Sequence, residues 1–325
     1  MSELRWNPVL EEWIITATQR QDRTFFPPPE YCPLCPTKPG AFPTEIPAPD
    51  YDIVVFENKF PSLRPDPPEP AVEGTDLCPV RPAAGVCEVV VYSSDHNGEL
   101  ATMPFEKIHK LVYVWADRFE ELGNRPEVEF VFLFENKGRE IGVTLAHPHG
   151  QIYAYPFIPP VLERELRGCK RHFDARGGCL LCQLVREERE DGRRIVATNE
   201  SFVAFIPFFA RYPYEVHIHP LAHRPAITDF DADEKRHLAQ ILQTVIVKYN
   251  HLWPEHPSLP YIMVTHQRPT DAGSEAYPHY HYHIEFYPPY RTPDKLKYLA
   301  GSEAGAGAFI NDTLAEEKAE ILRNT

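Results

Sequence analysis

The chain has 325 residues, 43% of them hydrophobic, which is enough for two domains of ordinary size or one large unit with a packed core. Its formal charge of −14 argues against nucleic acid or an anionic membrane as the main partner, because phosphates would be repelled. No apolar run is long enough to span a bilayer and the N-terminus carries no secretory signal, so we expect a cytoplasmic protein.

Two CxxC pairs stand out along the chain. The first, Cys32 and Cys35, lies in a proline-rich segment that indicates ordered but irregular loops. The second is Cys179 and Cys182. Seven cysteines in a cytoplasmic protein do not suggest a disulfide framework, so the pairs favour metal binding. The cysteines that we interpret as buried or inert thiols are Cys78, Cys87 and Cys169.

The first half of the chain shows strand patterns on both sides of one helical pattern. Rows of β-branched and aromatic residues predict strands over 87–96 and 127–136. Between them, apolar residues at three- and four-residue spacing predict a helix over 104–123, which ends at a glycine. We expect a further strand over 147–156, which begins with the segment HPHGQ.

The second half repeats this order. The segment YEVHIHPLAH matches CEVVVYSSDH of the first half, and HYHIEFYPPY matches HPHGQIYAYP. We therefore expect strands over 214–223, 259–267 and 281–290. A threonine cap and an acidic first turn predict a helix over 228–252. The duplication indicates an α+β fold with a mostly antiparallel sheet and flanking helices. The two predicted halves are residues 1–168 and 169–325.

Each half also contains a set of two cysteines and two histidines. One histidine follows the strand after the CxxC pair, and the other begins the HxH segment. Two thiolates and two neutral imidazoles form a closed tetrahedral set that suits Zn²⁺, so we predict about two structural zinc ions per chain. The alternative for each set is a pair of buried cysteines without metal. The predicted ligands are Cys32, Cys35, His96 and His147 in the first set and Cys179, Cys182, His223 and His281 in the second.

The segment HPHGQ carries the predicted chemistry. If His147 binds zinc, His149 is available for other work, and residues two apart on extended backbone face the same side. Pro148 restricts the backbone between them, and Gly150 permits a close backbone approach to a ligand. A positioned neutral imidazole is a good nucleophile toward a phosphoryl group near pH 7. Gln151 can donate a hydrogen bond but cannot protonate a poor leaving group, so the pattern favours transfer between phosphates over hydrolysis.

The segments FENKGREIGVTLAHPHGQ, PLAHRPAITDF and KLKYLAGSEAGAGAF resemble the galactose-1-phosphate uridylyltransferase family of the histidine-triad superfamily, and the resemblance covers nearly the whole chain. It implies two histidine-triad-like halves, a homodimer, and ping-pong transfer of UMP from UDP-glucose to galactose 1-phosphate. By position it puts the uridylylated nucleophile on His149 and a phosphate-contacting amide on Gln151. Arg20 and Arg23 match residues that reach the neighbouring subunit's site. The other implied substrate contacts are Asn58, Phe60, Asn136, Thr144, Lys297 and Glu303.

The chain departs from the family pattern at several positions. The resemblance implies a further iron or zinc site, held in some members by a glutamate and three histidines. The matching residues are Glu165, His266, His283 and, where a histidine is common, Glu285. Ser302 replaces a sugar-contacting tyrosine, which leaves the hexose preference open.

Alternative functions follow from other features of the sequence. The second Cys/His set resembles one in plant ADP-glucose phosphorylase, so the main alternative is a phosphorylase of ADP-sugars or dinucleoside polyphosphates that uses the same histidine chemistry. A zinc-scaffolded binding module conflicts with the intact HxHxQ pattern, and a triad hydrolase conflicts with Gln151. We interpret His217 and His219 as packed histidines, and Lys137 and Arg139 as solvated charges or phosphate contacts.

Overall fold

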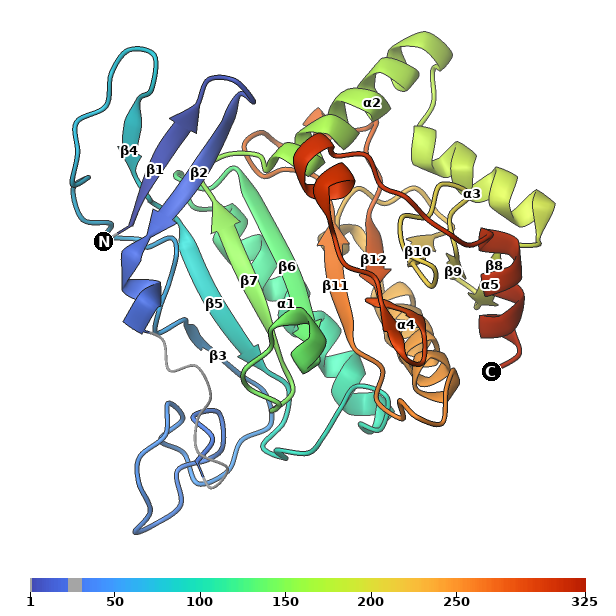
Figure 1. Ribbon diagram of the computed structural model, residues 1–325, viewed down its shortest axis with the longest axis horizontal. Helices are drawn as coiled ribbons and strands as arrows, with labels where there is room; N and C mark the ends of the chain where they lie inside the picture. The colour runs from blue at the N-terminus through green and yellow to red at the C-terminus, as the bar shows by residue number, and fades with distance from the viewer. Residues whose placement is uncertain (1, 23–30) are drawn as a thin grey trace.

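The computed structural model describes residues 2–22 and 31–325. Its centre is a nine-stranded sheet with the order β3-β5-β7-β6-β11-β12-β10-β9-β8, in which every neighbouring pair is antiparallel (Figure 1). The strands of this sheet are β3 (Val54–Glu57), β5 (Val86–Val91), β6 (Phe130–Lys137), β7 (His149–Tyr155), β8 (Ile195–Thr198), β9 (Phe202–Phe205), β10 (Val216–Pro220), β11 (Tyr261–His266) and β12 (His283–Tyr287).

The sheet consists of two related halves that meet edge to edge. From the centre outward the order is β6-β7-β5-β3 in one direction and β11-β12-β10-β9 in the other, and corresponding strands come from the two sequence repeats. The halves join through the β6–β11 pair, where Asn136 lies opposite Ile262. This arrangement confirms the predicted α+β fold with two related halves and a mostly antiparallel sheet.

Two long helices, α1 (Phe105–Gly123) and α4 (Ala232–His251), cover one face of the sheet and lie behind it in Figure 1. Their apolar sides pack with the sheet into one core, which contains the fully buried rings of Trp115 and Tyr249. Because each helix presents a continuous apolar stripe, this face of the sheet is closed to solvent. The site residues therefore project from the opposite face.

Most predicted elements are present with shifted ends. The helix expected over 228–252 begins later, at Ala232, because Asp231 caps it. The Asp231 carboxylate accepts a hydrogen bond from the Glu234 backbone N–H at 2.8 Å, and the Glu234 carboxylate accepts one from the Asp231 backbone N–H at 3.0 Å. The predicted threonine cap, Thr228, lies instead in a short 3₁₀ turn before the helix.

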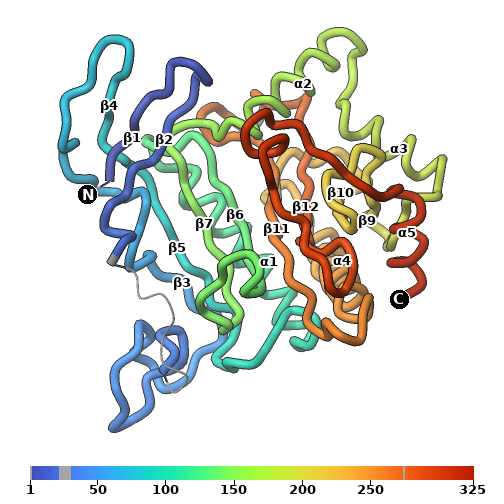
Figure 2. Tube along the Cα trace, in the orientation of Figure 1, coloured from blue at the N-terminus to red at the C-terminus, as the bar shows by residue number. Residues whose placement is uncertain are grey.

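Smaller elements surround the sheet, and the C-terminal segment crosses its open face in front of β11 and β12 (Figure 2). The predicted boundary between residues 168 and 169 falls within α2. No helix in the described ranges is both long and apolar enough to cross a membrane. The remaining elements are β1 (Ser2–Asn7), β2 (Glu12–Ala17), β4 (Val80–Pro82), α2 (Pro160–Arg176), α3 (Leu180–Asp191), β13 (Tyr290–Thr292), β14 (Lys295–Leu296), α5 (Ala315–Arg323) and short turns at Thr18–Asp22, Arg139–Ile141, Ile227–Asp229, Ser274–Ala276 and Gly301–Gly305.

Candidate active site and metal sites

The first predicted Cys/His set converges at the end of β5 and the start of β7. Its four possible ligand atoms all lie within 4.8 Å of one another. The Sγ atoms of Cys32 and Cys35 lie 3.7 and 3.6 Å from Nδ1 of His147, and His96 Nδ1 lies 3.5 Å from Cys35 Sγ. The Nε2–H of His147 donates to the Ser93 carbonyl at 2.7 Å, which leaves the lone pair on Nδ1 facing the thiols.

Burial reinforces the same protonation state at this set. Because it disfavours the charged imidazole, burial lowers the pKa of His147 to about 4. A neutral imidazole with its lone pair toward two thiols is a competent ligand. The donor set, its compactness and its tautomer therefore suit a tetrahedral zinc ion.

The second Cys/His set repeats this geometry in the other half. Its ligand atoms also lie within 4.8 Å of one another. Cys182 Sγ lies 3.3 Å from His223 Nδ1 and 3.7 Å from His281 Nδ1, and the Nε2–H of His281 donates to the Pro220 carbonyl at 3.0 Å. Cys179, at the N-terminus of α3, completes the set. The sequence repeat is thus matched by two equivalent sets of ligands.

His149 opens β7 on the uncovered side of the sheet. Its Nδ1–H donates to the His147 carbonyl at 2.7 Å, so the lone pair of the ring lies on Nε2. Along β7, His149 and Gln151 are half-buried while Gly150 and Ile152 are buried, as expected for alternating faces. The predicted nucleophile and the predicted amide therefore project to the same side.

A cavity of about 350 Å³ lies beside these two residues. Its wall combines apolar side chains, among them Leu34 and Phe56, with polar groups. Six residues that the sequence analysis singled out for catalysis or substrate contact line this cavity. They are Arg20, Asn58, Phe60, Thr144, His149 and Gln151.

Arg20 and Asn58 shape the cavity through backbone contacts. Arg20 donates to the carbonyl of Phe60 at 3.3 Å and to the Ser62 hydroxyl at 3.0 Å, within its own chain. The Asn58 side chain accepts from the Phe60 backbone N–H at 2.9 Å. These three contacts hold the segment around Phe60 against the cavity. Arg23, predicted beside Arg20, lies outside the described residues.

Other predicted contacts lie elsewhere in the chain. Among the described residues, the cavity wall does not include Asn136, Lys297 or Glu303. The fully buried Lys297 ammonium donates to the Ile310 carbonyl and lies 3.8 Å from the Glu303 carboxylate. Lys137, for which a phosphate contact was one interpretation, is instead paired with Glu99 at 2.6 Å.

The predicted third metal set also comes together, under the C-terminal segment. Glu165 extends from α2, His266 from β11, and His283 and Glu285 from β12, with their ligand atoms within 4.8 Å of one another. His266 Nδ1 lies 3.0 Å from Glu165 Oε2, and His283 Nε2 lies 3.4 Å from Glu285 Oε1. Two carboxylates and two imidazoles form a mixed N/O set that suits iron or zinc.

Comparison with known protein families matches the two halves of the chain to two separate family models. A family model described as the N-terminal domain of galactose-1-phosphate uridyl transferase matches residues 1–159, and one described as its C-terminal domain matches residues 165–325. This chain belongs to the galactose-1-phosphate uridylyltransferase family. The family resemblance identified from the sequence is therefore confirmed.

Three similar proteins illustrate the match. Galactose-1-phosphate uridylyltransferase of Thermotoga maritima is 42% identical over 327 residues, which cover 100% of this chain and 99% of that protein. A solved structure described as uridylyltransferase is 35% identical, with a TM-score of 0.86 and coverage of 99% and 97%. An ADP-glucose phosphorylase from Arabidopsis thaliana with bound ADP-glucose is 23% identical, with a TM-score of 0.73 and coverage of 100% and 99%, and shares the fold.

In this member of the uridylyltransferase family, the HxHxE segment of the second half repeats the geometry of the HxHxQ segment. The Nδ1–H of His283 donates to the His281 carbonyl at 3.0 Å, just as that of His149 donates to the His147 carbonyl. Glu285 takes the place that Gln151 has in the first half. Because a carboxylate replaces the amide, this position attracts a cation, whereas its counterpart Gln151 is uncharged and lines the cavity.

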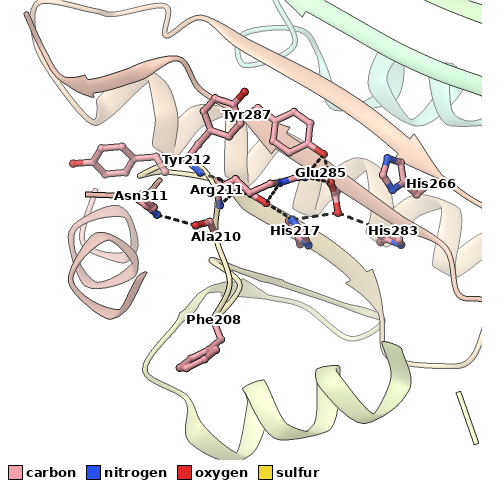
Figure 3. Close-up of polar contacts among 12 residues, drawn as sticks. Phe208, Ala210, Arg211, Tyr212, His217, His266, His283, Glu285, Tyr287 and Asn311 are labelled. Atoms are coloured by element: carbon pink, nitrogen blue, oxygen red, sulfur yellow. Dashed lines mark hydrogen bonds and ion pairs between the residues drawn. The ribbon is translucent and has the colours of Figure 1, made fainter. Parts of the chain in front are cut away.

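Sequence reasoning missed the partners that surround Glu285 in this family member. Arg211 donates to Glu285 at 2.9 Å and to the Tyr287 hydroxyl at 2.7 Å (Figure 3). His217 Nε2 lies 2.9 Å from Glu215 and 3.3 Å from Glu285. His217 is buried, as expected of a packed histidine, but its neighbours are carboxylates. The alternation of charged residues in the segment EVHIH, on an otherwise apolar strand, was the available signal.

Proposed function

We propose that this chain is a UDP-glucose–hexose-1-phosphate uridylyltransferase, which moves UMP between UDP-glucose and galactose 1-phosphate through a covalent intermediate on His149. One observation carries the proposal: His149, with its lone pair set on Nε2, and Gln151 line one cavity together. The names of the similar proteins support the same reaction.

The proposed transfer of UMP to His149 needs no external acid to protonate the leaving group. His149 Nε2 attacks the α-phosphorus of UDP-glucose, a P–N bond forms, and the P–O bond to glucose 1-phosphate breaks. The leaving group departs as a phosphate oxyanion and needs no proton. The His147 carbonyl, which accepts the Nδ1–H at 2.7 Å, stabilises the positive charge that develops on the ring. An oxygen of galactose 1-phosphate then attacks the same phosphorus, which restores His149 and releases UDP-galactose.

The surrounding residues suit a phosphorylated substrate. Gln151 donates a hydrogen bond to a phosphoryl oxygen, and the Arg20 guanidinium supplies positive charge in a chain of net charge −14. Asn58, Phe60 and Thr144 contact the nucleotide or sugar. The protein acts as a cytoplasmic homodimer, in which Arg20 and Arg23 reach the neighbouring subunit's site. Asn136 contacts phosphate or sugar, and Lys297 and Glu303 contact the sugar.

The two Cys₂His₂ sets each hold one zinc ion that supports folding, and the halves 1–168 and 169–325 each contain one such site. The Glu/His set around Glu285 holds one further divalent cation, either iron or zinc. Two buried carboxylates, those of Glu215 and Glu285, pair with the Arg211 guanidinium, and the partly buried Glu165 carboxylate pairs with His266. These three carboxylates carry two more charges than Arg211 offsets, so one dication balances them.

Metal analysis tests these assignments. Purified protein is expected to contain about two tightly bound zinc ions and one further dication per chain. Glu285→Gln is expected to weaken binding of the further ion at least about 10-fold, because it removes a charged ligand. Elemental analysis after dialysis against increasing concentrations of a chelator measures the metal content and the strength of metal binding. Glu188→Gln removes an equally buried carboxylate outside the set and should change neither count. Equal metal content in Glu285→Gln and the natural protein would remove the third site.

Intact-mass spectrometry tests the proposed reaction directly. Incubation with UDP-glucose is expected to add the mass of one UMP per chain, and galactose 1-phosphate is expected to remove it. ADP-glucose should label the protein poorly. Efficient labelling by ADP-glucose, followed by release with inorganic phosphate, would instead assign the phosphorylase alternative. An unlabelled protein that still exchanges hexose phosphates would mean direct transfer and would exclude a covalent histidine.

A further inference from the structure

Gly150, between the proposed nucleophile and Gln151, is packed from behind by a side chain. A Cβ atom at this position would lie 2.3 Å from the Tyr92 hydroxyl oxygen and 3.2 Å from Tyr92 Cζ. From its place in the segment HPHGQ, this glycine is predicted to permit the close approach of a ligand. The close neighbour in the structure is instead Tyr92, on the helix-covered side of the sheet, where its ring packs near Trp115.

Tyr92 cannot move away from β7 easily, because its backbone N–H and its side-chain hydroxyl both form hydrogen bonds. Its backbone N–H donates to the Pro148 carbonyl at 3.1 Å, and its hydroxyl donates to Glu135 at 3.0 Å. The other oxygen of Glu135 accepts from the Tyr261 hydroxyl at 3.0 Å. All three side chains of this triad, Tyr92, Glu135 and Tyr261, are buried.

The triad connects the two halves of the fold beneath the cavity. Tyr92 follows β5, Glu135 lies on β6, and Tyr261 begins β11 in the second half, opposite Lys137. Burial raises the pKa of Glu135 to about 7 and also raises the pKa values of both tyrosines, so that the hydroxyls remain donors. The second half of the chain therefore contributes a hydrogen bond to the support of β7.

A purely structural network is the simpler interpretation, since buried polar groups need partners wherever they occur. The Tyr92–Glu135–Tyr261 network differs from a purely structural network in its position next to β7. The Tyr92 hydroxyl packs against β7 at Gly150, and the residues on both sides of Gly150 are proposed to act on the phosphate. Any displacement of Gly150 moves His149 and Gln151 together.

We propose that Tyr92, held by Glu135 and Tyr261, is a positioning residue that sets the place of β7 and thereby the reach of His149 Nε2 to the phosphorus atom. This inference rests on the proposed uridylyl transfer. Displacement of a reacting group by about 1 Å costs on the order of 10²-fold in rate, so a small shift of β7 is enough to be measured.

A double-mutant cycle tests the proposal. Gly150→Ala is expected to lower the single-turnover rate of uridylylation about 100-fold with little change in substrate affinity, because the added methyl group meets the Tyr92 hydroxyl. Tyr92→Phe removes that oxygen and alone should cost only a few-fold. The double variant should recover at least about 10-fold relative to Gly150→Ala. Losses that simply multiply in the double variant would overturn the positioning role.

Two further variants keep the test decisive where Gly150→Ala does not fold. Tyr261→Phe lies away from β7. It removes the hydrogen bond from the Tyr261 hydroxyl to Glu135 and should slow uridylylation several-fold. Tyr249→Phe removes an equally buried hydroxyl, bonded to the Tyr214 carbonyl at 2.7 Å, and should lower thermal stability without slowing the reaction. Equal rates for these two variants would also overturn the proposal.

The outcome for the natural protein separates this inference from the function on which it rests. If UDP-glucose labels the natural protein and the cycle shows no recovery, the positioning role alone is wrong. If the natural protein is not labelled at all, the proposed function fails first and the positioning role fails with it.

Discussion

Replacement of His149 by glycine is expected to abolish covalent labelling by UDP-glucose and to lower the rate of exchange by on the order of 10⁶-fold, the scale for loss of a covalent nucleophile. The fold and both zinc sites should remain, because His149 lines the cavity and belongs to neither Cys/His set. The Gln151 side chain cannot replace the ring, since its amide nitrogen has no available lone pair. Intact mass and single-turnover kinetics measure the loss.

Chemical rescue provides a sharper version of this experiment. The space left in His149→Gly is expected to admit free imidazole, which should attack UDP-glucose and release uridine 5′-phosphoimidazolate. His251→Ala serves as a control, because His251 lies exposed on α4 and its Nδ1 bonds the Val247 carbonyl of the same helix. A His149→Gly protein that still carries a UMP adduct would assign the nucleophile to a different residue.

Loss of a zinc ligand is expected to act on the fold. Cys32→Ser should lower the free energy of unfolding by about 4 kcal/mol and the Tm by roughly 10 °C, because removal of a structural metal is among the largest single-site effects. The segment that carries Cys32 and Cys35 buries Leu34 and Ile46 in a small cluster with Val89 and Val91 of β5. Because this cluster is small, we expect a bound metal to contribute much of the attachment of the segment to the sheet.

Calorimetry and zinc analysis of the Cys32→Ser protein measure this effect. Cys78→Ser is the matched control, because Cys78 is exposed and belongs to neither Cys/His set, and it should change neither quantity. Folded Cys32→Ser protein should still accept UMP from UDP-glucose, though less of it survives purification. A variant that keeps two zinc ions and the natural Tm would contradict the first metal assignment.

Several features followed from the sequence alone. The CxxC pairs and the HxH segments are local patterns whose chemistry depends on residues two or three apart, so they could be predicted as candidate ligand sets without a structure. The order of strands and helices was equally visible, because hydrophobic periodicity is itself local. The internal repeat then linked Cys32 to His147 and Cys179 to His281, pairs that the structure brings together.

Other features were decided only by the tertiary structure. Arg211 and Glu285 lie 74 positions apart, and Tyr261 and Glu135 lie 126 apart, so no local pattern records either hydrogen bond. The reason for Gly150 also lay outside its own segment, since its close neighbour is Tyr92. Periodicity specifies which face of a strand a residue occupies, whereas the strand that lies beside it depends on how the whole sheet closes. Here the β6–β11 junction joins the two halves and brings the Tyr261 hydroxyl of the second half to Glu135 of the first, at 3.0 Å.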